Sequence, residues 1–223
     1  MLVETFTFNS FQENTFIIYD KTKECLIIDP GCYTTTEKNT LVSFIDKFQL
    51  KPKRLINTHC HIDHILGNEF IINKFGLELE IHEKELIIFQ NSIEIAQMYG
   101  FSEYIHPDKE PTLLQEGENI NFGISSLNIL FTPGHSPGHI SLFNKNENIL
   151  LSGDVIFQGS IGRTDLPHGD HNQLINSISR EILPLSNTVQ IFPGHGPSTN
   201  LGFERKNNPF LQAEYIKQNS SAI

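Results

Sequence analysis

The segment 57–68, NTHCHIDHILGN, constrains this chain more than any other part of it. Four side chains that can bind a metal, His59, His61, Asp63 and His64, fall within six positions. So many polar donors would be costly to bury for packing alone. If residues 59–61 are extended, His59 and His61 point to the same side and can share one metal. Asp63 and His64 come where the chain turns into the next helix, so they can face a second metal.

Three further stretches each place one polar side chain directly after an apolar run. They are TPGHSPGH with His135, LSGDVIF with Asp154, and FPGHGPS with His195. Each has a glycine beside the polar residue, where the backbone must turn sharply or pass close to another group. Loops that follow strands commonly carry active-site residues. These stretches therefore predict further ligands at strand ends.

The seven candidates match the number of ligands that a two-metal site with one bridging carboxylate needs. Imidazole and carboxylate groups suit zinc, and also iron or manganese. We therefore predict two divalent metal ions, most simply zinc, bound by His59, His61, Asp63, His64, His135, Asp154 and His195.

The remaining histidines and Cys60 have simpler interpretations. His139 is predicted to support a ligand rather than to be one. Cys60 points away from its histidine neighbours and is predicted to be a packed thiol, with a thiolate ligand as the alternative. The other four histidines lie in polar surroundings and are predicted to be surface or loop residues: His82, His106, His168 and His171.

Apolar periodicity predicts an α/β chain that forms one domain over residues 1–223. The predicted strands cover residues 3–8, 15–19, 25–28, 54–57, 127–131, 140–143, 149–151 and 189–192. The predicted helices cover residues 34–48, 63–75, 83–99, 173–182 and, in the tail, 209–218. Residues 105–117 read as a loop.

Composition narrows the range of partners and locations. The net charge of −10 argues against nucleic acid, which needs a basic protein face. No run of about 18 apolar residues is present for a membrane span, and the N-terminus has no secretory pattern. Three scattered cysteines fit reduced thiols better than disulfides. We therefore expect a cytoplasmic protein that acts on a small molecule.

THCHIDH, TPGHSPGH, SGDVIF and PGHGP, in this order, resemble the metallo-β-lactamase superfamily. The resemblance implies a four-layer αβ/βα sandwich. It also implies that His59, His61 and His135 bind the first metal, that Asp63, His64 and His195 bind the second, and that Asp154 bridges them. Asp63 and Asp154 are then the catalytic carboxylates beside a water held between the metals.

GSIGRTDLPHGDH and GFERKNNPFL resemble compact bacterial enzymes of the glyoxalase II type. These enzymes are thioesterases, so the resemblance implies hydrolysis of an acyl-thiol such as S-D-lactoylglutathione. Arg163 stands where the family has a basic substrate-binding lysine, and its alternative role is a buried ion pair with Asp165 or Asp154. Two departures are evident. Pro197 replaces a tyrosine of glyoxalase II, and we expect no separate C-terminal helical domain.

Two other functions remain open from the sequence. Persulfide dioxygenases, which use one iron and O₂, share THCHIDH and GRTD. A metal-binding module without activity on a hydrolase fold is the other alternative, although every candidate ligand is present.

Overall fold

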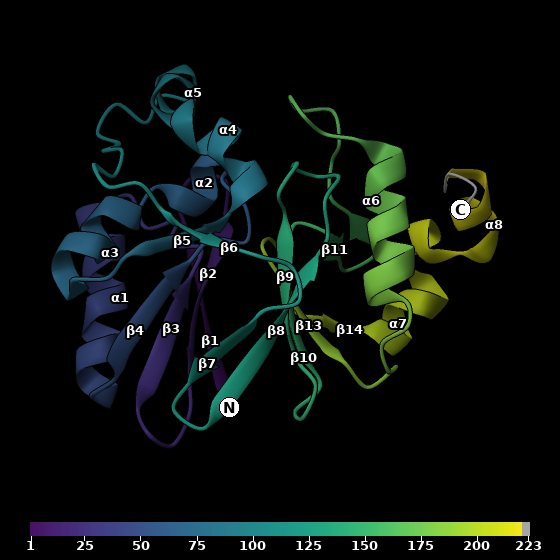
Figure 1. The fold of residues 1–223 in the computed structure, drawn as a ribbon, viewed down its shortest axis with the longest axis horizontal. Helices are drawn as coiled ribbons and strands as arrows, with labels where there is room; N and C mark the ends of the chain where they lie inside the picture. Colours follow the sequence, from purple (N-terminus) through teal and green to yellow (C-terminus); the bar gives the residue numbers. More distant parts are fainter. Residues whose placement is uncertain (220–223) are drawn as a thin grey trace. The chain divides into compact units, whose positions relative to one another are not determined.

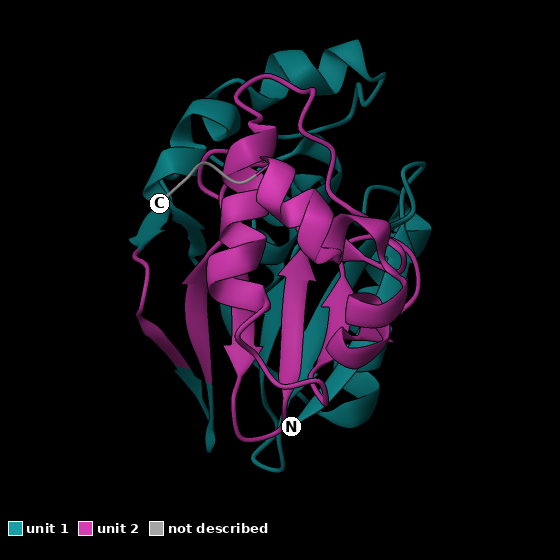
Figure 2. Cartoon of the chain, turned by 90° about the vertical axis from the view of Figure 1, so that its right-hand side faces the viewer, with its two compact units in different colours: residues 1–114, 121–126 teal, residues 115–120, 127–223 magenta. Residues whose placement is uncertain are grey.

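The computed structural model describes residues 1–219 and divides the chain into two compact units. Unit 1 comprises residues 1–114 and 121–126, and unit 2 comprises residues 115–120 and 127–223 (Figure 2). The expectation of a single domain stays a prediction.

Unit 1 is built on a six-stranded sheet in the order β1-β2-β3-β4-β5-β6. The strands are β1 Leu2–Phe8, β2 Glu13–Tyr19, β3 Glu24–Ile28, β4 Lys51–Ile56, β5 Leu79–His82 and β6 Thr112–Leu114. The first three pair antiparallel, and β3 to β6 pair parallel. The carboxyl ends of β3 and β4 therefore meet at one edge of the sheet, where Asp29 and the 57–64 segment begin.

Helices of unit 1 lie against this sheet (Figure 1). They are α1 Thr35–Phe48, α2 Ile62–Ile65, α3 Asn68–Phe75, η1 Glu83–Glu85, α4 Leu86–Gln90 and α5 Ser92–Met98. The helix predicted from residue 34 is confirmed as α1, which Thr34 begins with a capping box to Glu37. Leu41 and Ile45 of α1 are buried in a core that includes Ile17, Ile27 and Leu55.

Two predicted helices of unit 1 are interrupted. The helix predicted over residues 63–75 is divided into α2 and α3 near Gly67, where a side chain would meet Cys32 Sγ at 2.5 Å and Pro30 O at 2.7 Å. The helix predicted over 83–99 is divided into η1, α4 and α5, and Asn91, with ψ of 5°, separates α4 from α5. Strands β5 and β6 were not predicted, and β6 lies within the segment interpreted as a loop.

A second six-stranded sheet has the order β14-β13-β10-β9-β8-β7. Its strands are β7 Asn119–Phe122, β8 Ser125–Phe131, β9 Ile140–Asn144, β10 Ile149–Gly153, β13 Gln190–Pro193 and β14 Thr199–Asn200. Strand β9 runs antiparallel to both β8 and β10, and β13 runs parallel to β10. Strands β8, β10 and β13 therefore end at the same edge, where His135, Asp154 and His195 follow.

Unit 2 also contains one small hairpin and several helices. The hairpin is formed by β11 Ile156–Phe157 and β12 Ser160–Ile161. The helices are α6 His171–Ser177, the π-helical turn η2 Ile178–Ile182, α7 Leu201–Asn207, η3 Pro209–Leu211 and α8 Ala213–Asn219. Helix α6 packs Leu174 and Ile175 into a core with Leu150, Ile191 and Leu201. The tail predicted as one helix is two helices, and α7 was not predicted.

Candidate metal centre

The unit 1 candidates follow β4 as the sequence predicted. His59 and His64 are fully buried, Asp63 is 8 % exposed, and His61 is partly exposed at the start of α2. The ring centroid of His59 lies 4.8 Å from that of His61 and 4.1 Å from that of His64. The His64 Nε2 atom lies 3.7 Å from Asp63 Oδ2. Unit 1 therefore gathers its predicted imidazole and carboxylate donors into one cluster.

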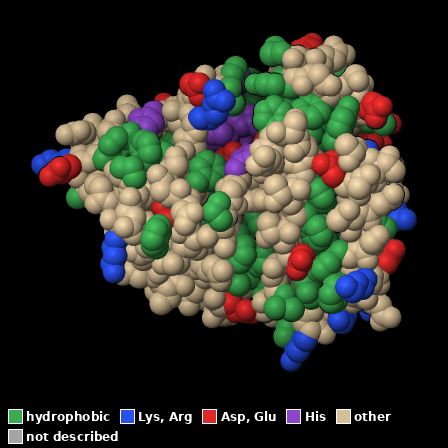
Figure 3. Space-filling view, turned by 180° about the vertical axis from the view of Figure 1, so that it is seen from behind, with side chains coloured by type: hydrophobic (Ala, Val, Ile, Leu, Met, Phe, Trp, Pro, Cys, Tyr) green, Lys and Arg blue, Asp and Glu red, His purple; other side chains and the backbone are tan. Residues whose placement is uncertain are grey.

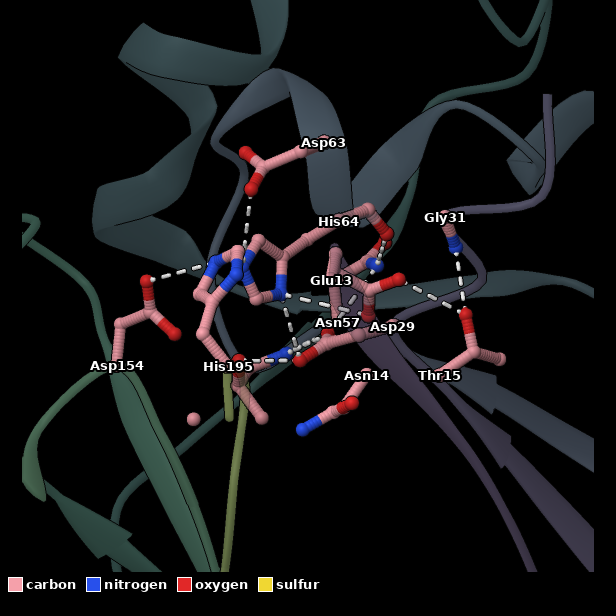
Figure 4. A network of polar contacts seen from close by, with 12 residues as sticks. Glu13, Asn14, Thr15, Asp29, Gly31, Asn57, Asp63, His64, Asp154 and His195 are labelled. Atoms are coloured by element: carbon pink, nitrogen blue, oxygen red, sulfur yellow. Dashed lines mark hydrogen bonds and ion pairs between the residues drawn. The ribbon is translucent and has the colours of Figure 1, made fainter. Parts of the chain in front are cut away.

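Asp29 is a further polar residue of this cluster, and the sequence did not identify it. It is buried at the carboxyl end of β3, with φ of 48°. Its carboxylate accepts from Thr58 N at 2.7 Å and from Thr58 Oγ1 at 2.6 Å, and it lies 3.1 Å from His64 Nδ1 (Figure 4). Because a carboxylate only accepts, His64 Nδ1 carries the proton. The lone pair of His64 is then on Nε2, the atom through which a metal could be bound.

Asp29 also sets the tautomer of His59, through Thr58. The Thr58 hydroxyl donates its proton to Asp29, so it accepts from His59 Nδ1, which is 3.1 Å away. His59 therefore also has its lone pair on Nε2. Asp29, His59 and His64 lie close enough to bind a metal together. Since the Asp29 oxygens already accept these hydrogen bonds, we assign Asp29 to orient the two histidines rather than to bind the ion.

Glu13 was also missed, and it lies behind His64. Its side chain is fully buried, with Oε2 accepting from Thr15 Oγ1 at 3.0 Å and Oε1 lying 3.9 Å from His64 Nδ1. Burial raises the pKa of Glu13 well above its usual range, and the nearby carboxyl groups of Asp29 and Asp63 raise it further. Gly31 makes room for this carboxyl group, because a Cβ there would lie 2.1 Å from Glu13 Oε2.

Unit 2 brings its three candidates together around one carboxylate oxygen. Asp154 Oδ2 lies 3.4 Å from His135 Nε2 and 3.4 Å from His195 Nε2. His135 Nδ1 donates to the Arg163 carbonyl oxygen at 2.7 Å, so its lone pair is on the Nε2 atom that faces Asp154. One carboxylate oxygen therefore lies equally near two imidazole nitrogens, so Asp154 would be able to share a metal ion with either histidine.

His139 supports Asp154, as the sequence predicted. The ring is buried, its Nε2 accepts from Asp154 N at 3.0 Å, and its Nδ1 therefore donates to Thr132 Oγ1 at 2.9 Å. Both ring nitrogens are thus used by the protein. A bulge in β10 between Leu151 and Gly153 turns the chain just before Asp154.

Arg163 differs from the interpretation as a buried ion pair. Its guanidinium forms two bonds of 2.7 Å with the Asp165 carboxylate, but the two side chains are 61 % and 68 % exposed. Arg163 therefore does form the ion pair with Asp165, but the prediction that this pair is buried is wrong. Hydrogen bonds from Arg163 lower the pKa of Asp165 to about 2.

Cys60 is a packed thiol, as predicted. It is 1 % exposed in the unit 1 core, and its backbone N–H donates to the buried Glu85 at 2.8 Å. Burial raises the pKa of the Cys60 thiol well above its usual range, and the nearby Glu85 and Asp29 add to this effect. A thiolate is therefore disfavoured here.

Among the other histidines, His82 corrects the prediction of a surface or loop residue. It is only 5 % exposed, at the end of β5, where its Nδ1 accepts from Lys84 N and begins η1. His168 is exposed, as predicted. His106 and His171 are partly buried, and their rings bond to Ser92 and Tyr215.

The donor chemistry of each unit fits a metal ion. The donors are imidazole nitrogens and carboxylate oxygens, and three of the imidazoles are held by the protein with Nε2 unprotonated. Histidine side chains reach the surface on the face shown in Figure 3, and His61 and His195 are the partly exposed members of the predicted set. No helix within residues 1–219 is long and apolar enough to cross a membrane.

Comparisons with known proteins agree with this chemistry. Residues 9–195 match the family model of the metallo-beta-lactamase superfamily. The hydroxyacylglutathione hydrolase GloC of Haemophilus influenzae is 37 % identical over 217 residues, which cover 96 % of this chain and 100 % of that protein.

Solved structures show the same fold, which confirms the predicted fold class. The BLEG-1 B3 metallo-beta-lactamase superposes with a TM-score of 0.86 at 34 % identity, over 95 % of this chain and 100 % of its own. The protein TTHA1623, solved in a di-iron-bound form, superposes with a TM-score of 0.84 at 32 % identity, over 94 % of this chain and 100 % of its own. With its family model, its relatives and its fold in agreement, the chain belongs to the metallo-β-lactamase superfamily.

Proposed function

We propose that this chain is a two-metal hydrolase that cleaves the thioester bond of a small acyl-thiol, of which S-D-lactoylglutathione is the leading candidate. The observation that carries the proposal is the complete donor set, with Asp154 Oδ2 equally distant from His135 and His195. The likeness to GloC, which extends over that protein's whole length, supports the thioester as the substrate class.

We assign the ligands as the family resemblance implies. His59, His61 and His135 bind one ion, Asp63, His64 and His195 bind the other, and Asp154 binds both. The protonated Nδ1 atoms of His59, His64 and His135 support this assignment, because each leaves Nε2 as the metal-binding atom.

Two divalent ions, when bound, would act as a Lewis acid and lower the pKa of a bound water to about 7. Asp63 and Asp154 would place two negative charges beside them, so the centre keeps a net positive charge that attracts a carbonyl oxygen. Asp29 fixes the tautomer and the orientation of His64, and the Arg163 carbonyl does the same for His135. A thiolate is a good leaving group, so the chain needs no strong general acid near the sulfur.

We further propose that Arg163 binds a carboxylate of the substrate. Its guanidinium is exposed and already holds a carboxylate in the two-bond geometry that arginine favours, that of Asp165. An exposed pair of this kind contributes little to stability, because water screens the two charges. Exchanging Asp165 for a substrate carboxylate would therefore cost little.

We propose zinc as the simplest metal for this chemistry, since hydrolysis needs no redox change. Iron remains the main alternative, because TTHA1623 was solved with two iron ions. The cytoplasm is the proposed location, and the three buried free thiols, Cys25, Cys32 and Cys60, are compatible with a reducing compartment.

A thiol-release assay with a panel of acyl-thiols, run without oxygen on zinc-loaded protein, tests the proposed activity. We expect hydrolysis well above the buffer rate, and its loss in Asp154→Asn, which keeps the shape of the side chain but removes its charge. An oxygen electrode run on iron-loaded protein with glutathione persulfide tests the competing chemistry. Rapid oxygen uptake, with every thioester left intact, would reject the hydrolase in favour of a dioxygenase.

A further inference from the structure

The hairpin over residues 154–163 contacts all three candidate ligands of unit 2. It begins with Asp154 itself. It ends at Arg163, whose carbonyl oxygen accepts from His135 Nδ1 at 2.7 Å. In between, the Phe157 ring packs edge-on against the His195 ring, with centroids 6.2 Å apart and planes at 70°. The position of this hairpin therefore affects every ligand that unit 2 contributes.

The base of the hairpin is tightly packed. Gly162 N donates to Val155 O at 3.2 Å, and a Cβ on Gly162 would lie only 1.9 Å from Asp154 O. Because Gly162 lies so close to the backbone of Asp154, we expect a displacement of the hairpin to shift that backbone.

The tip of the hairpin is held by one buried carboxylate from α7. Glu204 is fully buried and accepts from Gly159 N at 2.8 Å, Thr199 Oγ1 at 2.6 Å and Asn208 Nδ2 at 3.0 Å. Asn208 Nδ2 also donates to Ser160 O at 2.9 Å, on the next residue of the same turn. Several separate donors thus hold the turn and the buried carboxylate together, so this contact resists displacement.

We infer that Glu204 and Asn208 are positioning residues for the metal centre, acting through the hairpin over residues 154–163. This inference rests on the proposed use of Asp154, His135 and His195 as metal ligands. These contacts also give a role to the segment GFERKNNPFL, residues 202–211, which contains no candidate metal ligand. Glu204 accepts from the tip of the hairpin at Gly159 N, and Asn208 donates to the same turn at Ser160 O. We call this pair of contacts the clamp.

Metal affinity of Glu204→Gln tests the inference. The amide keeps the size of the side chain but offers one accepting oxygen in place of two, so it cannot accept from both Gly159 N and Thr199 Oγ1 as Glu204 does. Residues that hold metal ligands in place typically change affinity by about 10–100-fold when mutated. We expect a loss of this size in zinc affinity, measured by competition with a chelator. The visible spectrum of the cobalt-substituted protein should change as well, because it reports ligand geometry.

Arg205→Gln is the matched control. Arg205 is next to Glu204 on α7 and holds the carbonyl oxygens of Leu183 and Leu185 and the side chain of Asn187, but none of these bonds involves the hairpin. This variant should lose thermal stability while keeping the parent zinc affinity and cobalt spectrum. All affinities are measured well below the melting temperature of each variant, so that global unfolding does not contribute.

Parent-like zinc affinity and cobalt spectrum in folded Glu204→Gln would overturn the inference, as would equal losses in Glu204→Gln and Arg205→Gln. Should Glu204→Gln not fold, the same comparison is made with Asn208→Ala, which retains the carboxylate. A selective loss of affinity without thioester cleavage by the parent protein would support the clamp and reject the proposed function, so the two failures are distinguishable.

Discussion

Replacing Asp29 with asparagine should weaken metal binding although Asp29 is not a predicted ligand. In the parent protein its two oxygens receive hydrogen bonds from Thr58 N, Thr58 Oγ1 and His64 Nδ1. Asparagine offers one accepting oxygen and one NH₂ group. At least one buried donor would then face another donor, and the protonation of His59 and His64 at Nδ1 would no longer be enforced.

The size of the effect follows from these contacts. A buried donor left without an acceptor costs about 1–3 kcal/mol of folding free energy. Loss of the group that orients a metal-binding histidine costs about 10–100-fold in metal affinity. Such a change corresponds to about 1.4–2.8 kcal/mol of binding free energy. We therefore expect Asp29→Asn to be both less stable and weaker in metal binding.

Asp20→Asn is the matched control within unit 1. Asp20 is also a buried carboxylate that accepts several hydrogen bonds, from Thr22, Ile124 N and Ser125 Oγ, but it contacts none of the candidate ligands. We expect lower stability with unchanged metal affinity. Chelator competition gives the affinity and thermal unfolding gives the stability. Equal zinc affinity in Asp29→Asn and the parent would refute the role assigned to Asp29.

The other predictions concern pH and Arg163. Burial alone would raise the pKa of Asp20, but hydrogen bonds from Thr22, Ile124 and Ser125 lower it to about 2. Its contribution to stability is therefore complete above the unfolded value of about 4 and is lost as pH falls toward 2. Chemical denaturation across this range should show the stabilities of Asp20→Asn and the parent converging, and a constant difference would contradict the argument. Metal should leave the protein below about pH 6, where free imidazole protonates, and full metal content at pH 4.5 would contradict a site made mainly of histidines. Arg163→Ala should raise KM with little change in kcat or metal content, whereas lower stability with an unchanged KM would assign Arg163 a structural role.

The candidate ligands were recognisable because their chemistry and spacing are visible in the sequence. After the first strand end, two histidines are separated by one residue. At the later strand ends, a glycine stands beside each candidate ligand. Both patterns indicate strand ends that turn toward a site. Asp29, Glu13 and Glu204 carry no comparable signal. Each is a single carboxylate whose partners are distant in sequence, so only the fold reveals that it is buried and hydrogen-bonded.

The errors in secondary structure have a similar physical origin. Residues 83–99 have helical periodicity throughout, but the break at Asn91 depends on local backbone geometry that periodicity does not report. His82 has polar neighbours in sequence, yet parallel pairing between β5 and its neighbours buries it. The burial of His82 depends on how strands distant in sequence pair with one another. The residues next to His82 in the sequence carry no information on that pairing.

The most direct test of the account is a titration of metal-free protein with zinc under anaerobic conditions, with thioester hydrolysis as the readout. The proposed ligand set predicts activity that rises with added zinc and reaches its plateau at two equivalents per chain. Full activity at one equivalent, or no thioester cleavage at two, would contradict the two-metal hydrolase.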